Sequence, residues 1–374
     1  MKKLCITTFY GSENYGSNLQ AVGLSEFFKS AGYEVFFLSA FKNLPFILKH
    51  PMLFYAKAIN KINKKKYMAF FIPETYAIST EREQRLKDFR DEHFCTLDYK
   101  DSREWKEAIR NKTIFVAGSD IIWNPAKGYP ATFFLDFAYY AKLPRFSYGT
   151  SVGAKKLPTQ YYRAYRRYLG SMLGVGVREQ SVADELEQII DRKVNTVVDP
   201  SLLLTRSEWD KFAEKAQIPD LESTDYVLCY FVMNDSRYWD YVKHIREQTG
   251  MEIVVLPMHK EDEDKPYTII TDGTPYEFIK LIKDASFVCT DSFHACIVSM
   301  IYEKDFYLLR RKRKAEDAKY KNLLSRYQLM DRVVKDETKF IEKPQTDYSR
   351  ARLILEADRE RSIAYLNSVL QKCN

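Results

Sequence analysis

Paired cysteines, long apolar runs and membrane signals are missing from this 374-residue sequence. No apolar run reaches the roughly 18 residues that a membrane span requires, and the apolar run within residues 1–9 is too short for a signal peptide. No C-x-x-C pair occurs, which favours reduced, mostly buried thiols in a cytoplasmic protein. The six cysteines are scattered at Cys5, Cys95, Cys229, Cys289, Cys296 and Cys373.

Histidine is also scarce, with five in the chain. His259 lies beside the acidic run 261–264, but no His/Asp spacing there matches a metal motif, so we expect a solvated loop and no required metal. His259 is the second choice for a catalytic histidine. His50, His93 and His244 lie in charged, inserted or helical segments and are weaker candidates.

No sign of charge dominates the sequence. There are 58 Lys and Arg residues against 51 Asp and Glu, which gives a net charge of +7. Because the acidic residues are interspersed throughout, this excess indicates a mild preference for anionic ligands and no nucleic-acid partner. The 27 tyrosines and 24 phenylalanines suit a sugar-binding surface and an ordinary core equally.

Apolar strand patterns and amphipathic helix patterns alternate along the chain, without repeats. Near the start, a strand at 4–9, a glycine-bearing turn at 11–18 and a helix ending at Gly32 form a βαβ opening, in which Ser17 and Gln20 have capping-box spacing. Strands at 226–232, 252–256 and 287–290 repeat the alternation in the second half. The pattern predicts an α/β protein with two Rossmann-like domains facing across a cleft.

The predicted domain boundary lies near the Asp199-Pro200 pair. We expect an N-terminal domain over residues 1–198 on the acceptor side of the cleft, with an insertion at 41–110. A C-terminal domain over 199–345 would face the donor. The final helical segment, 346–374, could pack back across both domains.

Residues 41–72 mix lysines with bulky apolar side chains. Lys57, Lys61 and Lys64–Lys66 among Phe, Tyr, Met and Ile could lie on the inner face of a membrane. The alternative is a helical insertion that packs on the domain with its lysines solvated. Residues 80–110 are charged and helical and indicate a solvated face.

Residues 286–302 are the stretch most suggestive of a ligand site. A buried strand is followed at once by Asp291, Ser292 and His294 and then by a helix at 295–302. Ligands of α/β proteins bind at the carboxyl ends of parallel strands, and helix N-termini attract anions. His294 could donate a proton there. In the alternative reading, Asp291 or Ser292 caps the helix and His294 packs.

Other polar residues follow predicted strands. Asp120 could accept a hydroxyl proton or form a turn with Ser119. Trp123 could stack on a sugar ring or fill the core. Arg178 could grip a carboxylate or phosphate, or pair with Glu179 or Asp184.

Six stretches in family order resemble the polysaccharide pyruvyl transferases and cover most of the chain. They are Asn14–Gln20, Gly118–Asn124, Gly176–Glu179, Val198–Pro200, Pro275–Ala285 and Thr290–His294. The resemblance implies a glycosyltransferase-B-like architecture with phosphoenolpyruvate as co-substrate and no cofactor. The implied acceptor is a sugar of a cell-surface polysaccharide or of its lipid-linked precursor, and the product is a pyruvate ketal.

Ketal formation requires a proton for the methylene carbon of the donor and a base for the acceptor hydroxyl. His294 is the expected acid and Asp120 the expected base. Arg178, Ser292 and Asp291 are expected to bind the donor. The expected acceptor-binding residues are Asn14, Tyr15, Asn18, Trp123 and Asn124.

The chain departs from the family in two places. Some members carry Arg-Leu-His where this sequence has Ser292-Phe-His294, and Ala295 replaces the usual glycine. The missing arginine removes one expected donor contact, and Arg310, Arg311 or Arg313 could supply that charge instead. The alternative for 310–314 is a solvated loop between strand and helix.

Two other functions stay open at this point. The same architecture would suit a glycosyltransferase that uses a nucleotide-sugar donor. A family member without its donor arginine could also act, without catalysis, as a membrane-surface partner in polysaccharide assembly.

Overall fold

The structure is a computed structural model. It describes residues 1–38, 79–98, 101–124, 131–153, 157, 159–219, 221, 223–309, 317–336, 338–342 and 345–373. The lysine-bearing segment 41–72 and the basic run with Arg310, Arg311 and Arg313 lie outside these residues.

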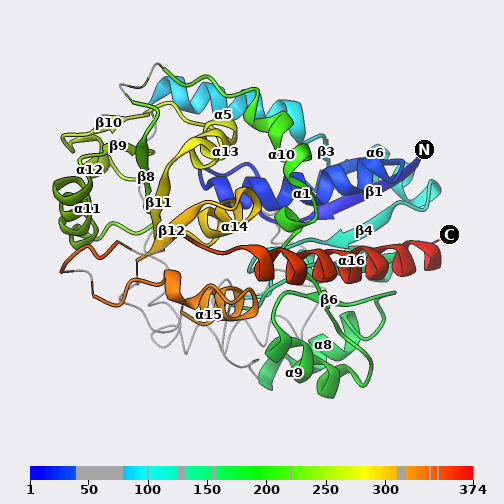
Figure 1. Ribbon diagram of the computed structural model, residues 1–374. Helices are drawn as coiled ribbons and strands as arrows, with labels where there is room; N and C mark the ends of the chain where they lie inside the picture. The colour runs from blue at the N-terminus through cyan, green and yellow to red at the C-terminus, as the bar shows by residue number, and fades with distance from the viewer. Residues whose placement is uncertain are drawn as a thin grey trace.

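The N-terminal half forms a five-stranded sheet in which every strand pair is parallel, with the order β3-β2-β1-β4-β5 (Figure 1). A two-stranded parallel sheet, β6-β7, adjoins it through bridges from Thr150 to Asp120 and Val177. The strands are β1 Lys2–Thr7, β2 Tyr33–Leu38, β3 Thr96–Leu97, β4 Ile114–Ala117, β5 Arg145–Ser147, β6 Gly176–Val177 and β7 Asn195–Thr196. The helices are α1 Tyr15–Ser30, α5 Thr80–His93, α6 Ser102–Arg110, η3 Ala131–Phe134, α7 Asp136–Tyr140, η4 Thr159–Tyr161, α8 Tyr162–Tyr168 and α9 Gln180–Ile190.

The C-terminal half forms a second all-parallel sheet with the order β10-β9-β8-β11-β12. Its strands are β8 Tyr226–Tyr230, β9 Glu252–Val255, β10 Thr268–Ile269, β11 Phe287–Thr290 and β12 Asp305–Leu308. The helices are η5 Pro200–Leu202, α10 Arg206–Ala213, α11 Ser236–Thr249, α12 Lys260–Glu263, α13 Pro275–Asp284, α14 Phe293–Tyr302, α15 Asp317–Arg326, η6 Met330–Arg332 and α16 Ser349–Lys372. The predicted α/β class with two Rossmann-like units is confirmed.

Both faces of the central strands are buried, which explains their continuous apolar runs. In the second sheet, Leu228 and Val288 point into one cluster with α13 and α14, whereas Val227 and Cys289 point into another with α11. The first of these clusters also contains Leu4 and much of α1. One hydrophobic core therefore lies between the two sheets and holds them together.

Caps explain where several helices begin. Asn14 caps α1 and accepts from the N–H groups of Gly16 and Ser17, so the expected capping box at Ser17 and Gln20 is wrong, and Ser17 lies inside the helix. Thr274 and Glu277 form a capping box at the start of α13, as the Thr274-Pro-Tyr-Glu277 sequence by itself predicts. An aspartate or asparagine can accept from two free N–H groups, which makes it a strong cap.

Helix α5 is more than the solvated face expected from its charge. Arg82, Leu86, Phe89 and His93 are buried along one side. After α5, strand β3 pairs in parallel with β2 and extends the sheet. The part of the predicted insertion that the structure describes thus belongs to the βαβ alternation.

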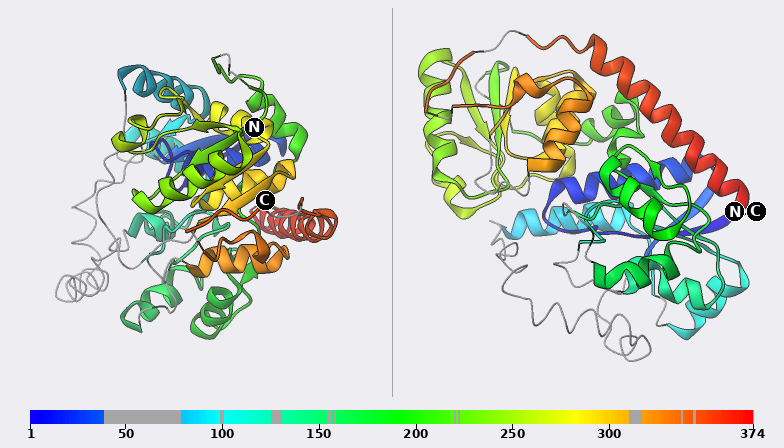
Figure 2. Two further views of the ribbon diagram at one scale, coloured as in Figure 1. Left: turned by 60° about the vertical axis from the view of Figure 1, so that its left-hand side comes forward. Right: turned by 90° about the horizontal axis from the view of Figure 1, so that it is seen from below.

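Helix α16 runs from the second sheet back to the first, and its end lies near the N-terminus (Figures 1 and 2). The Tyr365 hydroxyl donates to the carbonyl of Ser147, and Ser362 Oγ accepts from the N–H of Val198. A Cβ at Gly176 would lie 2.8 Å from the Tyr365 ring. The helix therefore packs directly against the strands that lead to the site described below. Among the described helices, none combines the length and apolar character of a membrane span.

Candidate active site

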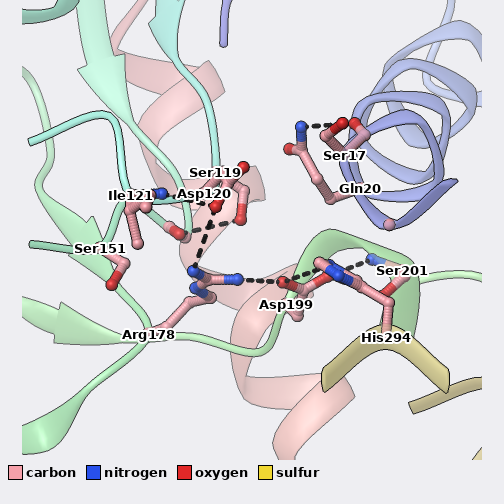
Figure 3. A network of polar contacts seen from close by, with 12 residues as sticks. Ser17, Gln20, Ser119, Asp120, Ile121, Ser151, Arg178, Asp199, Ser201 and His294 are labelled. Atoms are coloured by element: carbon pink, nitrogen blue, oxygen red, sulfur yellow. Dashed lines mark hydrogen bonds and ion pairs between the residues drawn. The ribbon is translucent and has the colours of Figure 1, made fainter. Parts of the chain in front are cut away.

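Four acidic and basic side chains from different parts of the chain form a row between the two sheets (Figure 3). Arg178 Nη1 lies 2.5 Å from Asp199 Oδ2, and its Nη2 lies 4.0 Å from Asp120 Oδ1. His294 Nε2 lies 3.7 Å from the same Oδ2 of Asp199. The order Asp120–Arg178–Asp199–His294 alternates acidic with basic groups.

Strand ends and helix starts position each member of this row. Asp120 follows β4, Arg178 follows β6, and Asp199 precedes η5 as its cap. His294 lies in the first turn of α14, whose cap is Ser292. Because parallel strands end at the same edge of a sheet, polar residues that are distant in sequence meet here.

Asp199 is the most buried of the four, with its side chain 2% exposed. Its Oδ1 accepts from the N–H and the hydroxyl of Ser201. Burial would raise the pKa of this carboxyl, but His294, Arg178 and Ser201 outweigh burial and hold the pKa well below its usual range. Asp199 is therefore a fixed negative charge that orients two basic side chains.

The imidazole of His294 packs against the N-terminus of α1 in the other half of the protein. A Cβ at Gly16 would overlap the ring and lie 2.9 Å from His294 Cβ. The His294 side chain is 13% exposed, and its buried Nε2 has no hydrogen-bond partner among the described residues. Gly16 thus makes room for a histidine held between α1 and Asp199.

Asp120 has a left-handed backbone, with φ of 72°. Its Oδ1 accepts from the N–H of Ile121 at 2.7 Å, and its side chain is 22% exposed. Non-glycine residues rarely adopt this conformation, and where they do the turn around them holds it. The turn is anchored by Ser119, whose hydroxyl donates to Gly149 O and whose carbonyl accepts from Thr8.

A cavity of about 470 Å³ opens beside Arg178 and Asp199. Its walls come from the start of α9, from the segment before η5, and from helices α15 and α16. Basic groups outnumber acidic ones on these walls. The charged lining residues are Arg178, Lys319, Lys321, Arg326 and Arg361 with Glu179, Asp199 and Asp358.

The structure brings together His294, Asp120 and Arg178, which the sequence had suggested separately. The partner of Arg178 is Asp199, whereas the alternative reading expected Glu179 or Asp184. Glu179 instead accepts from Ser151, and Asp184 accepts from Gln180.

Three residues expected to contact ligands are fully buried. Asp291 accepts from the N–H groups of Val232 and Met233 beyond the end of β8. Trp123 lies in the core with its Nε1 donating to Phe133 O. Tyr15 is buried between the sheets, and its hydroxyl donates to Gly273 O. Because none of these side chains has an exposed face, we assign them structural roles.

The remaining predicted residues are near the site but engaged in local structure. Ser292 Oγ accepts from the N–H of Ala295 as the cap of α14. Asn14 caps α1, and buried Asn18 bonds to the loop residues Gly11 and Ser12. Asn124 lies against Gly153.

His259 lies outside the row of Asp120, Arg178, Asp199 and His294. It is buried, and its Nε2 lies 2.9 Å from Val232 O. This contact fixes the loop after β9, so His259 packs structurally.

Two parts of the site were not predicted from the sequence, namely Asp199 and the side chains of α15 that line the cavity. Asp199 was part of a matched motif but received no role. The available signal was an Asp-Pro pair directly after a predicted strand, where an aspartate both caps a turn and faces the ligand edge.

Solved structures with similar chains include two classes of sugar-active protein. UDP-GlcNAc 2-epimerase from Neisseria meningitidis, bound to UDP-GlcNAc, is 11% identical with a TM-score of 0.47, over 100% of this chain and 94% of that one. The glycosyltransferase SnogD from Streptomyces nogalater is 10% identical with a TM-score of 0.47, over 100% of both chains. The fold assignment rests on the strand order of the two sheets and not on these similarities.

No curated protein sequence matches the chain. The family model for polysaccharide pyruvyl transferase matches residues 14–313, which include Asp120, Arg178, Asp199 and His294. The match covers most of the chain and agrees with the resemblance of the six motifs. The chain belongs to the polysaccharide pyruvyl transferase family.

Proposed function

We propose that this protein transfers the pyruvyl group of phosphoenolpyruvate to a sugar of a cell-surface polysaccharide or of its lipid-linked precursor. Two sugar hydroxyls and the central carbon of the donor form a cyclic pyruvate ketal, and inorganic phosphate leaves. Family membership supports transfer to a polysaccharide. The observation that carries the proposal is that one carboxylate oxygen of Asp199 faces both Arg178 and His294.

His294 is the proposed general acid. Its proton goes to the methylene carbon of phosphoenolpyruvate, which becomes the methyl group of the product, and the neighbouring carbon becomes oxocarbenium-like. Asp199 stays ionised because its own pKa is held low, and its Oδ2 faces His294 Nε2. This arrangement suits a histidine that must be charged before it reacts.

Arg178 is the proposed anchor for the carboxylate or phosphate of the donor. Its guanidinium is oriented by Asp199 and retains N–H groups for a second anion, since a guanidinium has five donors. Its Nε has no hydrogen-bond partner among the described residues. The donor would then sit beside the proton source.

Asp120 is the proposed base for the acceptor. The first sugar hydroxyl bonds to the oxocarbenium carbon and passes its proton to Asp120. The second hydroxyl displaces phosphate as the ring closes, and its proton leaves with the phosphate. Asp120 lies 4.0 Å from Arg178 and is the most exposed carboxylate of the row. It is therefore the member that an acceptor can reach.

The test is phosphate release from phosphoenolpyruvate with a panel of lipid-linked saccharides, comparing wild type with His294→Gln and His294→Ala. Acceptor-dependent release should fall by about 10²–10⁴ in both variants, while phosphoenolpyruvate should still raise the melting temperature of each. Release that is equal in all three proteins would remove His294 as the acid. Protection by nucleotide sugars and not by phosphoenolpyruvate would contradict the proposed donor.

A peripheral membrane contact through 41–72 stays a prediction from the sequence. It fits an acceptor carried by a lipid on the cytoplasmic face, and it predicts salt-sensitive binding to anionic vesicles that is lost when Lys57, Lys61 and Lys64–Lys66 are replaced.

A further inference from the structure

The end of α15 and the middle of α16 meet at one buried carboxylate, that of Asp358. Arg326 donates to both of its oxygens through Nε and Nη2, and Arg361 donates to Oδ1 through Nη2. The Tyr327 hydroxyl donates to Oδ2 at 3.4 Å. The Asp358 side chain is 3% exposed, whereas those of Arg326 and Arg361 are 47% and 65% exposed. One buried carboxylate therefore holds two guanidinium groups that reach solvent, and we call these three residues the Asp358 cluster.

The Asp358 cluster lines the same cavity as Arg178 and Asp199. Hydrogen bonds fix it to the segment before η5. The buried Ser362 hydroxyl donates to the carbonyl oxygen of Asp358 and accepts from the N–H of Val198, the residue before Asp199. The two arginines are therefore held at a fixed place relative to the row that the proposed reaction uses.

The Asp358 cluster carries more positive charge than a structural ion pair requires. One carboxylate balances one guanidinium, but two arginines share Asp358, and Lys321 of α15 adds a third cation to the cavity wall. A guanidinium has five N–H donors, of which Arg326 uses two on Asp358 and Arg361 uses one. The excess charge and the planar donor groups suit an anion with several oxygens, as phosphate groups have.

The cavity has room for more than the three-carbon co-substrate. Its volume of about 470 Å³ is within the range of sites that enclose drug-sized ligands. Gln180, Ser181 and Thr196 add amide and hydroxyl groups to its lining, and these suit the hydroxyls of a sugar. The same cavity thus combines Arg178 and Asp199, a neutral polar wall and the basic Asp358 cluster.

We propose that Arg326 and Arg361, together with Lys321, bind the diphosphate that joins the acceptor saccharide to its lipid. The inference rests on the proposed function, because a lipid-linked acceptor supplies this group. With the diphosphate at the Asp358 cluster, the saccharide extends along the cavity towards Arg178 and Asp199. A nucleoside diphosphate carries the same anionic group, and the experiment separates these two sources.

The experiment measures dissociation constants by calorimetry for geranyl diphosphate, inorganic pyrophosphate and UDP. The proteins are wild type, Arg361→Gln, Arg361→Lys and Arg352→Gln. Arg352 is the matched control because it is an ion-paired arginine of the same helix with a side chain 55% exposed, and its partner is Glu303. Arg326 keeps Asp358 paired in every variant, and exposed ion pairs contribute little to stability. All four proteins should therefore melt alike without ligand.

Arg361→Gln should weaken the binding of geranyl diphosphate and of pyrophosphate by about tenfold or more, the loss expected for one charge-assisted contact. Arg361→Lys should recover part of the affinity, since it keeps the charge and loses the fork. Arg352→Gln should bind as wild type does. Equal binding by Arg361→Gln and wild type, or no binding of either probe to wild type, would overturn the inference.

Phosphoenolpyruvate distinguishes this site from the site of the donor. It should raise the melting temperature of Arg361→Gln as much as that of wild type, and it should not compete with geranyl diphosphate. Competition between the two would place the diphosphate at the donor site and reject the Asp358 cluster as its ligand.

The source of the diphosphate and the proposed function are tested separately. Tighter binding of UDP than of geranyl diphosphate, with the same loss in Arg361→Gln, would keep the anion site and assign it to a nucleotide, against the lipid-linked acceptor. If wild type binds geranyl diphosphate through Arg361 but is not protected by phosphoenolpyruvate, the proposed donor fails and the diphosphate site stands.

Discussion

His294 Nε2 lies 3.7 Å from Asp199 Oδ2, although the two residues are 95 positions apart and come from α14 and from the segment before η5. The same oxygen accepts from Arg178 at 2.5 Å. One buried carboxylate therefore sets the positions of the two basic groups that the proposed reaction uses.

Asp199→Asn should lower both activity and stability. The neutral amide keeps the shape of the side chain but leaves the charge of Arg178, whose side chain is 10% exposed, without its nearest partner. Breaking one member of a buried ion pair costs about 3–5 kcal/mol. The free energy of unfolding is measured in urea, beside acceptor-dependent phosphate release.

Ser201→Ala is the matched control for Asp199→Asn. It removes one hydrogen bond to Asp199 and keeps the carboxylate charge. The expected loss is about 1 kcal/mol with activity largely retained. Equal loss of activity in both variants would contradict a role for the Asp199 charge.

Gly16→Ala should destabilise the protein and reduce its activity. Alanine normally favours a helix over glycine by up to about 1 kcal/mol. At Gly16 the added Cβ would overlap the His294 ring and lie 2.9 Å from His294 Cβ, so α1 and α14 must separate. Overpacking of this kind costs about 1–3 kcal/mol. Denaturant unfolding of the variant and of wild type shows whether the free energy of unfolding falls or rises.

A double-mutant cycle isolates this contact. In a His294→Ala background the imidazole ring is gone and only Cβ remains, so Gly16→Ala should cost less than it does in wild type. If the two changes in the free energy of unfolding simply added, Gly16 would not contact His294, which would contradict the packing of α1 on α14.

Arg85→Ala should loosen the contact between the two halves. Arg85 on α5 lies 2.6 Å from Asp272 and 2.7 Å from Glu277, whose side chain is fully buried. Loss of hydrogen bonds to a buried charge costs about 1.5–3 kcal/mol. Lys87→Ala, on the same helix with a side chain 60% exposed, should change stability by less than about 0.5 kcal/mol. Thermal unfolding compares the two.

His93 should make the protein less stable in mild acid. Burial lowers the pKa of its imidazole to about 4, and its Nε2 lies 2.7 Å from the Tyr276 hydroxyl. In the unfolded chain the pKa returns to about 6.5, so the unfolded state binds more protons between these values. Stability is therefore lost as pH falls from about 6.5 to 4, by up to about 3 kcal/mol.

Unfolding by urea at several pH values checks this. His93→Phe should flatten the stability curve in this range because it removes the titrating group while keeping an aromatic ring beside Phe89 and Tyr276. An equally steep curve in the variant would assign the pH dependence to other groups.

Much of the fold followed from local pattern. The strand predicted at 287–290 has the bounds of β11, and the Thr274-Pro-Tyr-Glu277 sequence by itself predicts the capping box that starts α13. The start of α1 was predicted three residues late because Ser17 and Gln20 imitate a capping box, whereas Asn14 caps the helix. Local sequence preference alone does not decide between Asn14 and Ser17, because both are residue types that cap helices.

The sequence alone determined the residue types of the candidate site and the strands and helices that carry them. A polar residue directly after an apolar strand is at the ligand edge of a parallel sheet, whatever surrounds it. That rule was enough to select Asp120, Arg178 and His294. It could not tell a ligand-facing residue from a buried one, and Asp291 and Trp123 are buried.

Tertiary structure alone decided which side chains meet. The pairing of Arg178 with Asp199, the packing of Gly16 on His294 and the approach of Lys319 to Phe293 each join segments that are remote in sequence. Distances between such segments depend on the packing of two sheets and of α16 around one core. The sequence pattern predicts which residues belong to that core. It does not predict the distances between them, because these depend on all the packing contacts together.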